Sequence, residues 1–192
     1  MKRSPVILLT CLLMALSIST SAQRRTDIDS LFINGQCIGY TTTNWYCIEG
    51  DECPQFRVKS TDGKTISNRT FKGKTTVISF WIYACRPCRT ETSRVGPELI
   101  DLYSPDEFQF ISIGSGETLE SARKFSEQTN ATFPLCYDES GNVVKKFADN
   151  GFPKLFVVDS EGIVRMTESG FDDKKFNHLK EVVEELVKST SR

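Results

Sequence analysis

Residues 76–91 carry three signals in a fixed order: an apolar run, two cysteines separated by two residues, and a helix-like stretch. The run from Val77 to Ile82 is nearly all apolar, as expected for a central strand that is covered on both faces. Cys85 and Cys88 follow it, and a helix should start near Cys85. The start of a helix has free N–H groups and a partial positive charge, which stabilise a thiolate, the species that attacks a disulfide. The sequence therefore predicts a strand, a redox-active dithiol and a helix in succession.

Three other uses of a C-x-x-C motif fit this chain less well. A zinc site needs a second pair of Cys or His ligands, but the chain has no second C-x-x-C and its one histidine, His178, lies in a charged helix. Haem attachment needs a histidine directly after the motif, where this chain has Arg89. An inert structural disulfide is the plainest alternative, although the strand-to-helix context favours redox use. We expect no metal and no dissociable cofactor.

Length and charge narrow the remaining classes of protein. After removal of an N-terminal signal about 170 of the 192 residues remain, enough for one domain with a well-buried core. The chain has 24 Lys and Arg against 25 Asp and Glu, a formal net charge of −1, which is no electrostatic footprint for nucleic acid. We expect 1–22 to be a signal peptide, 23–50 an N-terminal extension and 51–190 the folded domain.

The N-terminus has the parts of an export signal. A basic end at 2–3 precedes a mostly apolar run at 6–16, and Thr20 and Ala22 are small residues placed for cleavage. The apolar run is shorter than the roughly 20 residues that span a bilayer, so no stable membrane span is expected in the mature chain. A lipoprotein cleavage box ending at Cys11 is an alternative, but the apolar run continues past it. We expect a periplasmic or otherwise exported protein, in a compartment where disulfides persist.

Four cysteines remain besides the motif in the mature chain: Cys37, Cys47, Cys53 and Cys136. Four cysteines allow three connectivities. Because the first three crowd into a short segment, we expect one structural bridge among them, with Cys37–Cys47 preferred. The third would be free or bridged to Cys136, which is also readable as a small apolar filler in a buried strand.

The remaining chain alternates strand-like and helix-like segments. Strands are expected at 55–60, 64–67, 75–83, 108–113, 135–137, 154–159 and 163–166, and helices from about 85 to 103, and at 119–129, 143–148 and 174–188. Gly96-Pro97 should interrupt the first helix, and Asn34-Gly35 marks a hairpin turn in the extension. This order predicts an α/β sandwich around a mixed sheet.

Several short motifs then match one known fold. In chain order they are Cys-Pro-Gln-Phe at 53–56 in place of an Ala-Pro-x-Phe entry, Phe-Lys-Gly-Lys at 71–74, Phe80-Trp81, Cys-Arg-Pro-Cys-Arg-x-Glu at 85–91, Gly-Phe-Pro at 151–153 and Asp-Ser-Glu-Gly at 159–162. Residues 53–188 thus resemble the thioredoxin-like fold, and within it the exported TlpA/ResA-like thiol–disulfide oxidoreductases. The resemblance implies a three-layer α/β sandwich, in which helices flank a central mixed β-sheet, with a short N-terminal extension.

The resemblance also implies roles within the motif. Cys85, the exposed cysteine at the helix tip, would be the nucleophile, and Cys88, shielded in the first turn, the resolving thiol. Arg86 would lower the pKa of Cys85 below the free value of about 8.5, or it is a solvated charge with little effect. Pro87 fits the first helical turn, where a missing N–H costs nothing. Trp81 would pack beneath the motif.

Pro153 resembles the cis-proline that faces the active site in thioredoxin-like proteins. A cis bond exposes the backbone of the preceding residue, Phe152, which can pair with an extended substrate as an added strand. Phe152 departs from the small or β-branched residue common there and could narrow the substrate groove. We expect these two residues to bind substrate together with Trp81, Arg86 and Pro87.

Glu91 follows Cys88 by three residues. TlpA/ResA-like proteins often place a glutamate there that influences thiol protonation, and a solvated helix carboxylate is the alternative. Cytoplasmic thioredoxins carry a buried Asp six residues before the first cysteine as proton acceptor, where this chain has Ser79. Serine cannot accept that proton, so Glu91 or water must serve.

The sequence as a whole predicts an exported oxidoreductase that exchanges the Cys85–Cys88 pair with disulfides or dithiols of envelope proteins, through a mixed disulfide on Cys85. A partner redox protein would supply or take the electrons. A peroxiredoxin-like thiol peroxidase is one alternative, since residues 88–91 weakly resemble its motif, but the required Pro and Thr are replaced by Trp81 and Cys85. A non-catalytic thioredoxin-like binding module is the other.

Overall fold

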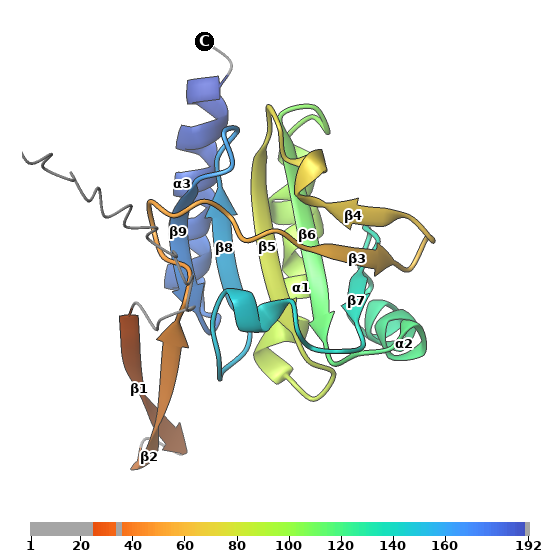
Figure 1. Ribbon diagram of the computed structural model, residues 1–192. Coiled ribbons are helices and arrows are strands. Elements are labelled where there is room, and N and C mark those ends of the chain that lie inside the picture. Colours follow the sequence, from red (N-terminus) through yellow and green to blue (C-terminus); the bar gives the residue numbers. More distant parts are fainter. Residues whose placement is uncertain (1–24, 34–35, 191–192) are drawn as a thin grey trace, which may run out of the picture.

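The computed structural model describes residues 25–33 and 36–190, and for residues 29–33 and 36–41 it describes the backbone only (Figure 1). The expected signal peptide and the Asn34-Gly35 turn lie outside the described residues. The helices and strands, in chain order, are β1 (Arg25–Ile33), β2 (Gln36–Trp45), β3 (Arg57–Ser60), β4 (Thr65–Ser67), the 3₁₀ turn η1 (Asn68–Thr70), β5 (Thr75–Trp81), α1 (Arg86–Glu98), η2 (Ile100–Leu102), β6 (Phe108–Ser115), α2 (Leu119–Thr129), β7 (Cys136–Asp138), η3 (Val144–Lys146), β8 (Lys154–Val158), β9 (Val164–Ser169) and α3 (Asp173–Thr190).

A mixed sheet forms the centre of the molecule. Its strand order is β4-β3-β7-β6-β5-β8-β9, with β5 parallel to β6 and antiparallel to β8. All residues of β5 are buried, because both faces of this strand are covered. Alternate side chains therefore enter different clusters: Ile78 and Phe80 pack on one face and Val77 on the other. The α/β fold with a central mixed sheet is as the sequence predicts.

Different kinds of structure cover the two faces of the sheet. Helices α1 and α3 lie behind it in Figure 1, and their apolar stripes pack against Val77 and the inward residues of β8. The segment 45–56 crosses the opposite face, where Trp45 and Phe56 belong to the same apolar cluster as Phe80. In this cluster the ring of Phe147 contacts the rings of both Phe56 and Phe80. The helix expected at 143–148 is only the short 3₁₀ turn η3, because the chain there turns back at once toward β8.

Helix α1 differs from its prediction at the C-terminal end. It runs through Gly96-Pro97 to Glu98, and the short turn η2 follows. Pro97 is the penultimate residue of α1, so the helix loses one hydrogen bond and no following turn is disrupted. Gly96 is needed for packing, since a Cβ atom there would lie 2.5 Å from the hydroxyl oxygen of Thr132.

The N-terminal extension is a two-stranded hairpin that continues into the domain. β1 pairs antiparallel with β2 on either side of residues 34–35. Beyond the end of β2, the N–H groups of Tyr46 and Cys47 both donate to the carbonyl of Phe147, at 2.9 and 3.0 Å. In Figure 1 the hairpin projects from the end of the sheet where β5 ends and β8 begins. This is the end that carries the two motif cysteines.

Candidate active site

The dithiol lies where β5 gives way to α1. The chain turns after Trp81, and the N–H of Cys85 donates to the carbonyl of Ile82 at 3.0 Å. Cys85 is the N-cap residue of α1, which begins at Arg86, and the N–H of Cys88 donates to Sγ of Cys85 at 3.1 Å. This sulfur therefore takes the place of the side-chain oxygen that usually caps a helix.

Cys85 and Cys88 form a disulfide, with their Cα atoms 5.3 Å apart. The two residues differ in accessibility, since Cys85 is 9% exposed and Cys88 is 1% exposed. Cys88 lies on the buried face of α1, in the same apolar cluster as Trp81. A molecule that approaches from solvent therefore meets Cys85 first.

Glu91 lies one helical turn beyond Cys88 on the same buried face. It is only 2% exposed, so the interpretation as a solvated helix carboxylate is wrong. The hydroxyl of Ser79, on β5, donates to Oε1, whereas Oε2 has no hydrogen-bond partner among the described residues. Burial raises the pKa of Glu91 to about 8, and the bond from Ser79 opposes that rise. The carboxyl group is therefore mostly protonated at neutral pH.

Aromatic side chains support the motif from the interior. The ring of Trp81 is 1% exposed and stacks on Phe125 of α2, with centroids 4.0 Å apart. This confirms that Trp81 packs beneath the motif. Arg89 donates to the carbonyl of Tyr83 at 2.8 Å and lies 5.4 Å from the centre of its ring. These contacts fix the turn between β5 and α1 on which the position of the cysteines depends.

The other residues expected at the site lie around the same end of α1. The Phe152–Pro153 peptide bond is cis, which confirms that expectation. Phe152 is half-buried and packs against the apolar cluster that contains both cysteines and Trp81. Arg86 and Pro87 are exposed at the helix tip. The structure thus gathers the expected residues in one place, and their binding of substrate stays a prediction.

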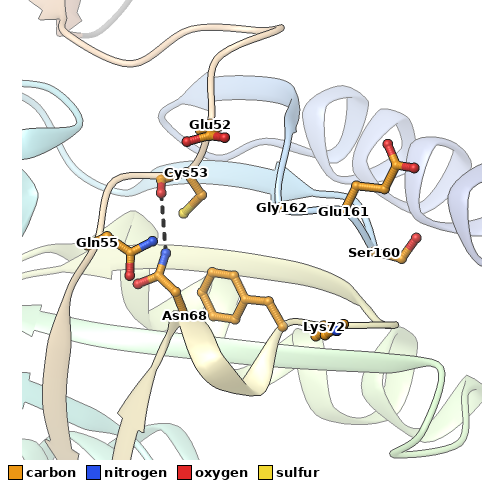
Figure 2. Close-up of a pocket in the computed structure, with 9 residues that line it drawn as sticks. Glu52, Cys53, Gln55, Asn68, Lys72, Ser160, Glu161 and Gly162 are labelled. Atoms are coloured by element: carbon orange, nitrogen blue, oxygen red, sulfur yellow. Dashed lines mark hydrogen bonds between the residues drawn. The ribbon is translucent and has the colours of Figure 1, made fainter.

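Two of the remaining cysteines are buried thiols. Cys53 and Cys136 are free, so neither forms the bridge to the other that the sequence allowed, and burial raises the pKa of both to about 12. Cys53 lines a pocket of about 440 Å³ beside the turn 160–162 (Figure 2). That turn follows the end of β8, whereas the start of β8 pairs with the end of β5 that leads to the dithiol. A thiol with so high a pKa is a poor nucleophile. The Cys37–Cys47 bridge stays a prediction, because the side chain of Cys37 lies outside the described residues.

The role of Ser79 is the feature that sequence reasoning missed. Ser79 was expected only to lack the carboxylate that cytoplasmic thioredoxins have at this position, yet its hydroxyl donates to the buried carboxyl group of Glu91. The available signal was the spacing of Cys88, Glu91 and Val95, which places all three on one face of a helix. That face packs against the strand that carries Ser79.

Within residues 25–33 and 36–190, no group of three or more His, Cys, Asp or Glu side chains is arranged to hold a metal ion. In the same part of the chain, no helix is both long enough and apolar enough to cross a membrane.

Comparison with known proteins adds to this geometry. A family model described as the AhpC/TSA family matches residues 49–167, a range that includes the dithiol, Glu91 and Pro153. The thiol-disulfide oxidoreductase ResA of Bacillus thuringiensis subsp. konkukian is 30% identical over 150 residues, or 78% of this chain and 83% of that protein. ResA of Bacillus cereus is 29% identical over 164 residues, or 82% of this chain and 91% of that protein. A solved structure from Bacteroides thetaiotaomicron, provisionally described as a protein disulfide isomerase, matches with a TM-score of 0.71 and 25% identity, and covers 75% of this chain and 92% of that one.

Proposed function

The chain belongs to the thioredoxin-like AhpC/TSA family and is a ResA-like thiol–disulfide oxidoreductase, and from this we propose that it acts outside the cytoplasm on cysteine pairs of other proteins. The observation that carries the proposal is the difference in exposure between the two cysteines at the start of α1. Cys85 is the more exposed cysteine and receives an N–H bond, while Cys88 is buried behind it. The export signal expected at 1–22 supports the location.

In the reducing direction, the thiolate of Cys85 attacks one sulfur of a substrate disulfide. A mixed disulfide forms, and the other substrate sulfur leaves as a thiolate. Cys88 then attacks the Cys85 sulfur, which releases the reduced substrate and closes the Cys85–Cys88 disulfide. Two electrons have passed to the substrate, and a partner redox protein returns them to the pair. The same steps in reverse oxidise a substrate dithiol.

The N-cap position of Cys85 supplies the reactivity that the first step needs. Once the disulfide is reduced, the N–H of Cys88 and the partial positive charge of the helix start favour the thiolate of Cys85. Arg86 is exposed directly beside it and adds positive charge. Cys88 lacks this help, because it lies inside the first turn at 1% exposure.

Glu91 exchanges a proton with Cys88 in the second step, in which the ionised minority of this carboxyl group accepts the thiol proton. Cys88 must lose its proton before it can attack, and it lies one turn from Glu91 on the same buried face. A carboxyl group with a pKa of about 8 is well matched to exchanging a proton with a thiol near neutral pH. Ser79 orients this group through its bond to Oε1.

The substrate protein binds across the tip of α1 and the Phe152–Pro153 pair. Phe152 offers its backbone to an extended segment, as an added strand. Arg86 and Pro87 form the exposed rim on the helix side. Trp81 contributes from beneath, since its ring is buried against Phe125.

Turnover of a protein disulfide tests the proposal. The mature chain should accelerate the reduction of insulin by dithiothreitol, and Cys85→Ser should reduce the rate to that of dithiothreitol alone. Cys88→Ser should instead trap partner proteins as mixed disulfides on Cys85 in cells, and their identification gives the substrates. Rapid oxidation by hydrogen peroxide without insulin reduction would favour the peroxidase alternative, and activity that survives Cys85→Ser would refute the nucleophile.

A further inference from the structure

A fully buried lysine follows Pro153 directly. Lys154 is the first residue of β8 and is 0% exposed. Its Nζ atom donates to the hydroxyl of Thr43, at 3.2 Å, and lies 5.1 Å from the centre of the Trp45 ring. An ammonium group is rarely buried in this way unless the structure depends on its contacts. The catalytic steps described above make no use of it.

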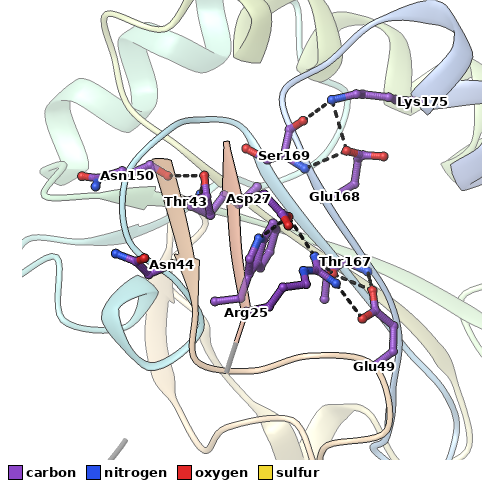
Figure 3. A network of polar contacts seen from close by, with 12 residues as sticks. Arg25, Asp27, Thr43, Asn44, Glu49, Asn150, Thr167, Glu168, Ser169 and Lys175 are labelled. Atoms are coloured by element: carbon purple, nitrogen blue, oxygen red, sulfur yellow. Dashed lines mark hydrogen bonds and ion pairs between the residues drawn. The ribbon is translucent and has the colours of Figure 1, made fainter. Parts of the chain in front are cut away.

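The groups around Lys154 belong to the N-terminal hairpin and to the loop 149–152, which leads to Pro153. The hydroxyl of Thr43 donates onward to the carbonyl of Asn150 at 3.4 Å, so it links the ammonium to the loop (Figure 3). Burial raises the pKa of Asp149, but hydrogen bonds from Asn44 and Tyr46 and, to a smaller extent, the positive charge of Lys154 lower it below its usual value. Lys154 is thus held between the end of β2 and the loop.

The end of the hairpin also binds the loop 149–152 through a second set of hydrogen bonds, which involve Asp149. The backbone N–H of Asn44 donates to Oδ1 of Asp149 and its side-chain amide donates to Oδ2, both at 2.8 Å. The hydroxyl of Tyr46 donates to Oδ2 at 3.0 Å, and the N–H of Asp149 donates back to the carbonyl of Asn44 at 3.0 Å. Asn150 and Gly151 both have left-handed backbone angles, with φ of 48° and 72°. For Asn150 that conformation is uncommon, and it persists where surrounding contacts fix it.

We propose that Lys154 is a positioning residue which, through Thr43, holds the loop 149–152 so that the backbone of Phe152 is ready to pair with a substrate strand. The N-terminal hairpin thereby contributes to the site that binds protein substrates. This inference rests on the proposed function, in which Phe152 receives an extended segment beside Cys85. Loss of the Lys154 ammonium group should weaken the binding of polypeptide substrates and leave the reaction at the Cys85 sulfur unchanged.

Two substrates separate binding from chemistry. Insulin presents a disulfide within polypeptide, whereas 2-hydroxyethyl disulfide is too small to pair with the Phe152 backbone, and dithiothreitol reduces the enzyme in both assays. In Lys154→Met, which keeps the length and loses the charge, KM for insulin should rise about tenfold with kcat little changed. Thr43→Val should give the same direction of change. In both variants the rate with 2-hydroxyethyl disulfide should stay within about twofold of the wild type.

A matched control comes from the contacts between the hairpin and β9. Glu49 accepts bonds from Arg25 and from the N–H of Thr167, and so anchors the hairpin to β9 without touching the loop (Figure 3). Glu49→Gln should leave KM for insulin unchanged, even if the hairpin becomes less stable.

The outcomes are distinct. A KM for insulin that stays at the wild-type value in folded Lys154→Met and Thr43→Val overturns the inference. A fall in the reduction rate that is equal for insulin and for 2-hydroxyethyl disulfide overturns it as well. If Lys154→Met does not fold, Thr43→Val decides alone, because it replaces a hydroxyl by a methyl of similar size. A wild-type protein that reduces neither substrate refutes the proposed function itself, before any variant is compared.

Discussion

A carboxyl group buried beneath the dithiol makes the folded protein sensitive to pH. The pKa of Glu91 is raised from 4.5 to about 8, chiefly because burial disfavours the charged form. Between these values the folded state keeps a proton that the unfolded chain has lost. The stabilisation is therefore complete below about pH 4.5 and declines as the pH rises toward 8, by up to about 1.4 kcal/mol per pH unit.

In Glu91→Gln this decline should disappear, because the amide has no proton to lose. Urea unfolding of the oxidised protein at several values between about pH 5 and 8 measures it. Glu98→Gln, an exchange at the far end of α1, is the control and should keep the wild-type decline. A wild-type free energy of unfolding that stays flat across this range would show that Glu91 is charged and stabilised in the folded protein.

At the scale of single residues, the sequence was informative where the chemistry is local. The spacing of Cys85 and Cys88 and their place after an apolar strand predicted a redox-active pair and a helix that starts near Cys85, and the structure shows Cys85 as the N-cap residue of that helix. The family resemblance placed Pro153 and Glu91 at the same site. The bond from Ser79 to Glu91 joins a strand to a helix, and which strand residue faces that carboxyl depends on packing, so it could not be predicted.

Among the elements, the contact between β5 and β6 depends on a residue without a side chain. Trp81 on β5 pairs with Gly114 on β6. A Cβ atom on Gly114 would lie 2.7 Å from Cζ2 of the Trp81 ring and 2.8 Å from Cβ of Glu117. Glu117 in turn accepts the N–H of Tyr83, at 2.7 Å, in the turn before the dithiol. Crowding at Gly114 should therefore disturb both the Trp81 ring beneath the motif and the hydrogen bond from Tyr83 to Glu117 in the turn before it.

Gly114→Ala should lower the free energy of unfolding by about 1–3 kcal/mol, because the interior has no room for an added methyl group. Thermal or urea unfolding measures the change. In a Trp81→Phe background the ring atoms that the methyl would meet are gone, so the same exchange should cost less. Equal costs in both backgrounds would show that the crowding lies elsewhere.

Helices and strands in which apolar residues recur with a clear period were predicted well, and segments without such a period were not. The helix at 119–129 matched in both bounds, since Thr118 caps its start and Asn130 ends it with left-handed angles. The stretch 143–148 has helix-forming residues but only one 3₁₀ turn, because η3 must lead directly into the loop before β8. The segment 45–56 has no regular pattern, and nothing local indicates that it crosses one face of the sheet.

For the whole molecule, the open question is where the domain begins. The sequence places the boundary between residues 50 and 51, shortly before the first family motif at 53–56. Trp45 lies before that boundary but is 0% exposed, and its ring packs edge-to-face on Phe156 of β8, with centroids 5.5 Å apart. It also covers Lys154. The end of β2 therefore belongs to the core that the domain needs.

A pair of truncated chains tests this boundary. A chain that begins at residue 51 loses Trp45, and removal of a buried tryptophan costs about 3–5 kcal/mol from a total stability of about 5–15 kcal/mol. It should melt at a much lower temperature than the mature chain and bind a dye that reports exposed apolar surface, because the rings of Phe147 and Phe156 are uncovered. A chain that begins at residue 43 keeps the bonds of Thr43 and the ring of Trp45, and should unfold cooperatively close to the mature protein. If the chain from 51 instead melts at the temperature of the mature protein, the hairpin is an appendage, and the loop before Pro153 holds its shape without it.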